Sequence, residues 1–78
     1  MLIRYFAGAA EAAGTRTESV ETADLTVDSL LAYLGAENPA LAQVLSVSAL
    51  LADGVRVEGK VSLRDVSQLD VLPPFAGG

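Results

Sequence analysis

The chain has 78 residues, of which 51% are hydrophobic and 19% charged, and it carries a formal net charge of −5. A chain of this length is expected to form one small domain over residues 1–78, with a core only just large enough to hold it folded. The sequence contains neither cysteine nor histidine, which excludes a thiolate nucleophile, an imidazole base, a Cys/His zinc site and a thiolate-bound iron–sulfur cluster. No metal site is predicted.

The charges also narrow the choice of partners. Only five residues are basic against ten acidic ones, so there is no basic stripe for nucleic acid and no polybasic patch for a membrane. The apolar runs are too short to span a bilayer, and the N-terminus lacks the pattern of a signal peptide, so a cytoplasmic location is expected. The acidic surface either steers the chain towards a basic protein cleft or simply keeps it in solution.

The first twenty-one residues predict a hairpin with a bulky loop. Residues 2–7 alternate two faces, with Ile3 and Tyr5 on one side and Arg4 and Phe6 on the other, as a strand does. Residues 9–13 are strong helix formers stopped by Gly14. Residues 15–21 then alternate polar and β-branched side chains, which is typical of an edge strand.

The middle of the chain predicts helices. Residues 27–34 carry an apolar stripe at i, i+3, i+4 and i+7, with Thr26 as N-cap and Gly35 as the stop. A second short helix is expected to begin with Asn38 as cap and Pro39 in its first turn. The stripe of the first helix is interpreted as core.

The last third returns to strands. Residues 49–52 and 55–58 flank Asp53-Gly54, a dipeptide suited to a tight hairpin turn, and residues 68–72 predict a final strand. Asp53 as a metal ligand is disfavoured, because no second carboxylate stands at a suitable spacing. Residues 58–60 predict another turn, and residues 61–63 a short connection. Strands before and after one main helix predict an α+β roll whose mixed sheet wraps over that helix, with the first and last strands paired in parallel at its centre.

The chain ends in Pro73-Pro74-Phe75-Ala76-Gly77-Gly78. Prolines fix φ and keep the residue before them extended, so residues 73–78 are expected to leave the fold as a stiff spacer. Without side chains, Gly77 and Gly78 would let the walls of a partner close around the backbone and its terminal carboxylate. That carboxylate is ionised at pH 7 and inert as an acyl donor, so another enzyme would have to activate it. A carried group is therefore favoured over a catalyst.

The element order, the length and this ending resemble the small subunit of molybdopterin synthase, in the ThiS/MoaD family of ubiquitin-like β-grasp sulfur carriers. The opening of the first strand at residues 3–7 and the entry into the main helix at residues 25–27 are also similar to that family. The chain departs from the family's usual turns at Asp53-Gly54 and at residues 65–68.

The resemblance implies a cycle of sulfur transfer. An E1-like enzyme would consume ATP to adenylate Gly78, and a persulfide donor would convert the adenylate into a thiocarboxylate. Inside the large catalytic subunit, as part of a heterotetramer, that sulfur would pass to cyclic pyranopterin monophosphate in molybdenum cofactor biosynthesis. The chain itself would be no enzyme and would hold no permanent cofactor. It would carry a nucleotide only while Gly78 is adenylated.

A docking surface follows from matching positions. We expect the partner-binding residues to be Phe6, Arg56, Leu72, Pro73, Pro74, Phe75 and Ala76, with Phe6, Leu72 and Phe75 forming an apolar patch and Arg56 a polar rim. The competing interpretation is that Phe6 closes a minor core under residues 9–13. Three other functions remain open: a sulfur carrier for thiamine or cysteine synthesis, a ubiquitin-like modifier that is joined to lysine, and a non-covalent β-grasp binding module.

Overall fold

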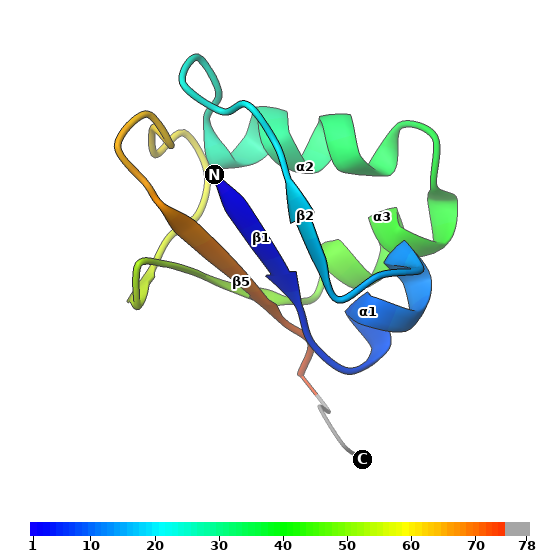
Figure 1. The fold of residues 1–78 in the computed structure, drawn as a ribbon. Helices are drawn as coiled ribbons and strands as arrows, with labels where there is room; N and C mark the ends of the chain where they lie inside the picture. Colours follow the sequence, from blue (N-terminus) through cyan, green and yellow to red (C-terminus); the bar gives the residue numbers. More distant parts are fainter. Residues whose placement is uncertain (75–78) are drawn as a thin grey trace.

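A computed structural model describes residues 1–74 of the chain as a mixed sheet covered on one face by helices (Figure 1). The strands are β1 (Leu2–Tyr5), β2 (Thr17–Ser19), β3 (Ala49–Ala52), β4 (Val55–Arg56) and β5 (Gln68–Leu72). The helices are α1 (Gly8–Ala13), α2 (Val27–Gly35) and α3 (Pro39–Leu45). The sheet order is β2-β1-β5-β3-β4, so the last strand of the chain lies at the centre of the sheet.

The central pair is parallel, as the sequence predicts. β1 runs alongside β5 with Leu2 opposite Gln68 and Tyr5 opposite Val71, while every other strand pair is antiparallel. The alternation read from the sequence explains the burial: Ile3 and Tyr5 are buried against the helices, and Arg4 is exposed on the other face. The first strand is shorter than expected, because Ala7 leaves it with a positive φ of 49°.

The main helix is fixed by its N-terminal cap. The Thr26 hydroxyl accepts the Ser29 N–H at 3.2 Å and the Ser29 hydroxyl accepts the Thr26 N–H at 2.8 Å, a reciprocal capping box. Val27, Leu30 and Leu34 of the predicted stripe are buried.

The main helix ends at Gly35, one residue later than predicted, but Gly35 is not the left-handed stop that the sequence suggested. Gly35 is its last residue, and the chain continues with Ala36 in the right-handed helical region. The reason for glycine lies elsewhere, because a Cβ on Gly35 would lie 2.8 Å from the Cβ of Ala42 in α3. Gly35 therefore permits the close approach of α2 to α3.

The two shorter helices follow the predicted signals. α1 ends at Ala13 and is capped by Gly14, which has the left-handed φ of 76° that glycine adopts easily. α3 begins at Pro39 and is capped by Asn38. The Asn38 Oδ1 accepts the Leu41 N–H at 3.1 Å, and its Nδ2 donates to the Ala12 carbonyl at 2.9 Å. Asn38 thus caps one helix and ties it to the end of another.

The β3–β4 turn has positive φ at both central residues, 48° at Asp53 and 86° at Gly54, as a two-residue hairpin turn requires. The Asp53 carboxylate accepts the N–H groups of Ser67 and Gln68, each at 3.0 Å. This side chain therefore fixes the start of β5 and is occupied by backbone donors. The flanking strand β4 is shorter than the predicted residues 55–58.

The core gathers thirteen buried apolar side chains from every helix and from three of the strands: Ile3, Tyr5, Ala9, Val27, Leu30, Leu34, Leu41, Leu45, Leu50, Ala52, Leu63, Leu69 and Val71. Leu63 comes from the segment expected to be a mere connection, yet its exposed fraction is 0%. Within residues 1–74, no helix has the length and apolarity needed to cross a bilayer.

Candidate functional site

The face of the sheet opposite the helices carries charged and apolar side chains in rows. The strand registers place Arg4 opposite Asp70, Asp70 opposite Leu51, and Leu51 opposite Arg56. Residues directly opposite each other share a face, so these four form one row across β1, β5, β3 and β4. We call this helix-free side the outer face.

An ion pair holds the middle of that row. Arg4 Nε donates to Asp70 Oδ1 at 2.8 Å, and Arg4 Nη2 donates to Asp70 Oδ2 at 2.9 Å. The hydrogen bonds from Arg4 lower the pKa of Asp70 below its ordinary value, and the bonds to Asp70 raise the pKa of Arg4. The Asp70 side chain is 16% exposed and that of Arg4 is 44% exposed, so one edge of the guanidinium still faces solvent.

The base of the tail lies beside this pair. The Phe6 N–H donates to the Val71 carbonyl at 3.2 Å, so Phe6 and Leu72 leave their parallel strands at the same end of the sheet (Figure 1). The Arg4 guanidinium carbon lies 5.3 Å from the centre of the Phe6 ring, within the range of a cation–π contact. Phe6, Leu72 and Pro73 are half-buried and Pro74 is exposed.

The alternative interpretation of Phe6 finds no support in this packing. Among residues 1–74, the partly buried apolar side chains that pack on the core include Ala10, Ala12 and Ala13 of α1 but not Phe6. The Phe6 ring instead lies under Arg4. It is half-buried, which is less exposure than the predicted apolar patch implied.

The structure thus brings together Phe6, Leu72, Pro73 and Pro74. Arg56 is exposed on the edge strand β4, separated from β5 by β3, so it lies apart from them. Phe75, Ala76, Gly77 and Gly78, also named from the sequence, lie outside the described residues. The partner-binding roles of all these residues remain predictions.

Sequence reasoning missed Arg4 and Asp70 as parts of this surface. The signal was present: opposite charges stand on the non-core positions of the two strands predicted to pair in parallel. What was missing was the register that places Arg4 directly opposite Asp70.

Three titratable groups of the described residues have a shifted pKa. Besides Arg4 and Asp70, a pKa shift is resolved for Tyr5, whose pKa is raised by burial and by its hydrogen bond to Glu18. Each of the three shifts favours the form already present at neutral pH, so none produces a base or acid poised near pH 7. In the described part of the chain, no group of three Asp or Glu side chains is placed to hold a metal ion.

Comparison with known proteins places this arrangement in a family. The ThiS family model matches residues 3–78, and the molybdopterin synthase sulfur carrier subunit of Chlamydomonas reinhardtii is 35% identical over 97% of this chain and 95% of its own length. The crystal structure of SAMP1 from Haloferax volcanii superposes with a TM-score of 0.79 at 30% identity, covering 100% of this chain and 98% of that one. The solution structure of the HVO 2177 protein from the same organism has a TM-score of 0.75 at 30% identity, covering 99% of this chain and 84% of that one. The predicted ubiquitin-like β-grasp is confirmed, and the chain belongs to the ThiS family.

Proposed function

We propose that this protein is the sulfur carrier subunit of a molybdopterin synthase, carrying sulfur on the carboxyl group of Gly78. The observation that carries the proposal is the family match, which runs through residue 78 and so includes the Gly-Gly ending. The relative that is 35% identical over nearly the whole chain bears that name. The absence of cysteine and histidine from the sequence also favours a chain that is acted upon.

The proposed cycle begins with activation of the tail. A carboxylate oxygen of Gly78 attacks the α-phosphorus of ATP in an E1-like enzyme, which forms an acyl adenylate and releases pyrophosphate. The terminal sulfur of a persulfide then attacks the acyl carbon and expels AMP. A second thiol reduces the resulting acyl disulfide, which leaves the thiocarboxylate on Gly78 and a disulfide on the donor.

Transfer follows in the large catalytic subunit, the partner with which this chain would form a heterotetramer. The thiocarboxylate sulfur attacks an electrophilic carbon of cyclic pyranopterin monophosphate, and an oxygen substituent of that carbon leaves as the carbon–sulfur bond forms. Water then cleaves the bond between the acyl carbon and sulfur, so the sulfur stays on the pterin and the Gly78 carboxylate is restored. A narrow tunnel around Gly77 would protect the thiocarboxylate from earlier hydrolysis.

The described residues supply the docking part of this proposal. β5 is paired on both sides, so it holds Leu72 and Pro73 in a fixed direction at the edge of the outer face. Phe6 and Leu72 would provide apolar contact at the base of the tail, and Arg56 a polar contact at the far edge of the sheet. The proposed site of action is the cytoplasm.

The test is the intact mass of the protein isolated from its native host without strong reductant or alkali, followed by fragmentation of the C-terminus. A mass gain equal to the replacement of one oxygen by sulfur, located at Gly78, would support the carrier chemistry. An unmodified Gly78 in cells that are making molybdenum cofactor would contradict it. The pathway is decided by reconstitution: sulfur delivered only to a thiamine or cysteine enzyme would replace the pterin assignment.

A second function uses the same activated carboxyl. The ubiquitin-like fold and the Gly-Gly ending also suit attachment of Gly78 to the amine of a partner's lysine. In that case the host would contain isopeptide-linked adducts. Self-conjugation would be limited to Lys60, the one lysine of the chain, which is exposed.

A further inference from the structure

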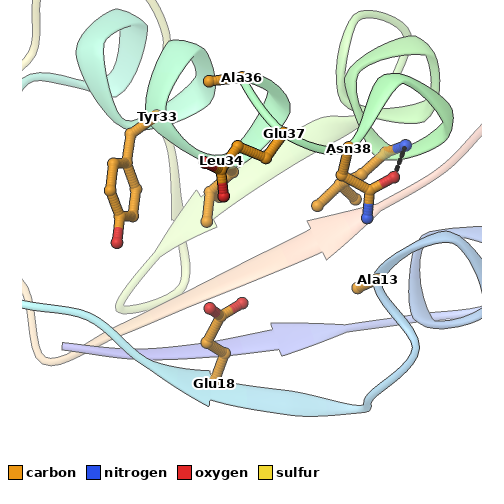
Figure 2. A pocket seen from close by; sticks show the side chains of 8 residues that line it. Ala13, Glu18, Tyr33, Leu34, Ala36, Glu37 and Asn38 are labelled. Carbon is orange, nitrogen blue, oxygen red and sulfur yellow. Dashed lines mark hydrogen bonds between the residues drawn. The ribbon is translucent and has the colours of Figure 1, made fainter.

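A groove lies on the helix side of the sheet, away from the base of the tail, between the edge strand β2 and the turn from α2 to α3. Its volume is about 420 Å³, and it is lined by Ala13, Glu18, Tyr33, Leu34, Ala36, Glu37, Asn38 and Leu41. Figure 2 shows Glu18 rising from β2 towards the helices and Tyr33 descending from α2 towards the strands. A second hollow of about 350 Å³ shares Glu18 and Tyr33 and extends the groove along β2.

The groove combines an apolar floor with an acidic rim. Leu34 and Leu41, which are 8% and 3% exposed, form the floor of the groove. Tyr33 lies on the rim and is 63% exposed. The rim carries Glu18 and Glu37, and the adjoining hollow adds Glu21. No lysine or arginine stands among the residues that line either hollow.

The polar groups of the rim differ in what they can still bind. Tyr5 Oη donates to Glu18 Oε1 at 2.8 Å, which orients the carboxylate and leaves Oε2 able to accept from a guest. Asn38 is occupied on both sides, by the Leu41 N–H and the Ala12 carbonyl. The charged hydrogen-bond acceptors left for a guest are therefore carboxylate oxygens, and they lie beside an exposed aromatic ring.

The free edge of β2 is closed to strand addition at Thr17, which leaves only the peptide groups of Ser19 along this strand. The hydrogen bonds of Val20 to Met1 and of Tyr5 to Arg16 show that the peptide groups of Thr17 and Ser19 point away from β1. The Thr15 hydroxyl donates to the Thr17 carbonyl at 2.9 Å and accepts the Thr17 N–H at 3.4 Å, so that peptide edge is already paired. A guest is thus recognised mainly by its side chain.

We propose that this groove binds an arginine side chain, flanked by an apolar residue, on an extended segment of a partner protein. A guanidinium group matches both features of the rim, since it stacks on a tyrosine ring and donates to carboxylates in a planar fork. The apolar neighbour covers the floor formed by Leu34 and Leu41. The volume is sufficient for one long side chain and part of its neighbour.

The chain itself is a poor occupant. Residues 73–78 contain no basic side chain and end in a carboxylate, so the acidic rim repels them. A second copy would bring another net charge of −5 to the same place. The groove therefore fits a basic partner, and it can be occupied while the tail is held elsewhere. This inference stands independently of sulfur transfer.

The test is a titration of the ¹⁵N-labelled full chain, followed by amide chemical shifts, with the blocked tripeptide acetyl-leucyl-arginyl-leucine amide. The control peptide replaces arginine by citrulline, which keeps the shape and removes the charge. We expect saturable shifts confined to residues 17–21 and 33–38, with a Kd on the order of 1 mM, and at least fivefold weaker binding of the citrulline peptide.

Single substitutions test which side chains of the groove bind the peptide. Tyr33→Ala and Glu37→Gln each alter an exposed side chain and are expected to weaken binding roughly fivefold, while Glu58→Gln, at an exposed carboxylate outside both hollows, leaves it unchanged. Equal binding of the citrulline peptide would overturn the proposal. So would shifts spread over distant acidic residues such as Glu58 and Asp65, or no saturable shift at about ten times the expected Kd.

Discussion

At the scale of single residues, the hydroxyl of Tyr5 sits at the boundary between the core and the β2 edge. The Tyr5 side chain is buried, and its hydroxyl donates to the exposed Glu18 at 2.8 Å. This bond ties β1 to β2 from inside the protein. It also joins the core to the groove that is lined by Glu18 and Tyr33.

Replacing Tyr5 by phenylalanine is expected to lower the free energy of unfolding by about 0.5–1.5 kcal/mol, the usual net contribution of one hydrogen bond. The cost stays small because Glu18 remains hydrated. The pKa of Tyr5 is raised in the fold, so its stabilising contribution is complete below the unfolded pKa of about 10 and is lost as the pH rises above it. Urea unfolding at pH 7 and at alkaline pH would check this: the parent should lose more stability than Tyr5→Phe on going to high pH.

The ion pair on the outer face predicts an acid dependence. The pKa of Asp70 is lower in the fold than the value of about 3.9 in an unfolded chain. Its contribution is therefore complete above about pH 4 and is lost as the pH falls through the folded pKa. Asp70→Asn should flatten the fall in unfolding free energy between about pH 4 and pH 2, measured by urea titration. Asp65→Asn, at an exposed carboxylate, is the control; an equal effect there would remove the special role of Asp70.

Residue-level packing was only partly readable from the sequence. The helical spacing of Val27, Leu30 and Leu34 predicted that they face the core, and all three are buried. Leu63 stands in a segment without periodicity, and it is buried because its N–H bonds to the Leu25 carbonyl at 2.9 Å, which draws the segment under the start of α2. That contact joins residues far apart in the chain, so no local pattern could predict it.

At the scale of elements, the crossing of α2 over α3 depends on Gly35. Gly35→Ala is expected to cost about 1–3 kcal/mol, because the new methyl group would lie 2.8 Å from the Cβ of Ala42 and force the helices apart. Thermal and urea unfolding would measure the loss. The double variant with Ala42→Gly should recover part of it, and Gly8→Ala, which meets nothing within 4 Å, is the neutral control. A Gly35→Ala protein as stable as its parent would show that the crossing can adjust freely.

Gly35 also shows which kind of contact could not be predicted from the sequence. A glycine at the end of an apolar stripe usually marks a helix stop, and the sequence offered no sign that another helix passes so close. By contrast, the caps at Thr26 and Asn38 and the turn at Asp53-Gly54 are local chemistry, and the structure has each where the sequence predicts it. Local signals were readable, and the close approach of α2 to α3 was not.

At the scale of the whole molecule, we expect the fold to be independent of the tail. Within residues 1–74, the buried apolar side chains run from Ile3 to Val71, so neither Pro73 nor Pro74 belongs to that core. Deleting Gly78 is expected to abolish sulfur transfer in a reconstituted synthase and to change the free energy of unfolding by less than about 0.5 kcal/mol. Circular dichroism with urea would check the second part. A variant that unfolds, or one that still transfers sulfur, would contradict the division of labour.

The overall architecture was predictable because alternation, caps and turns all indicated one α+β arrangement, with β1 and β5 parallel at its centre. The arrangement of the proposed docking residues was predictable only in part. Phe6, Leu72, Pro73 and Pro74 meet at one end of the sheet, but the row from Arg4 to Arg56 needs the strand registers, and these depend on pairings across the whole chain.

The placement of β5 also decides how the molecule bears force. Because β1 and β5 run side by side in the same direction, Met1 and Pro74 lie at opposite ends of the sheet (Figure 1). Tension between the two ends of the chain therefore loads all the β1–β5 hydrogen bonds together, in shear, instead of opening them one after another. A partner that pulls on the tail while the N-terminal end is held would therefore meet a fold that yields as a unit.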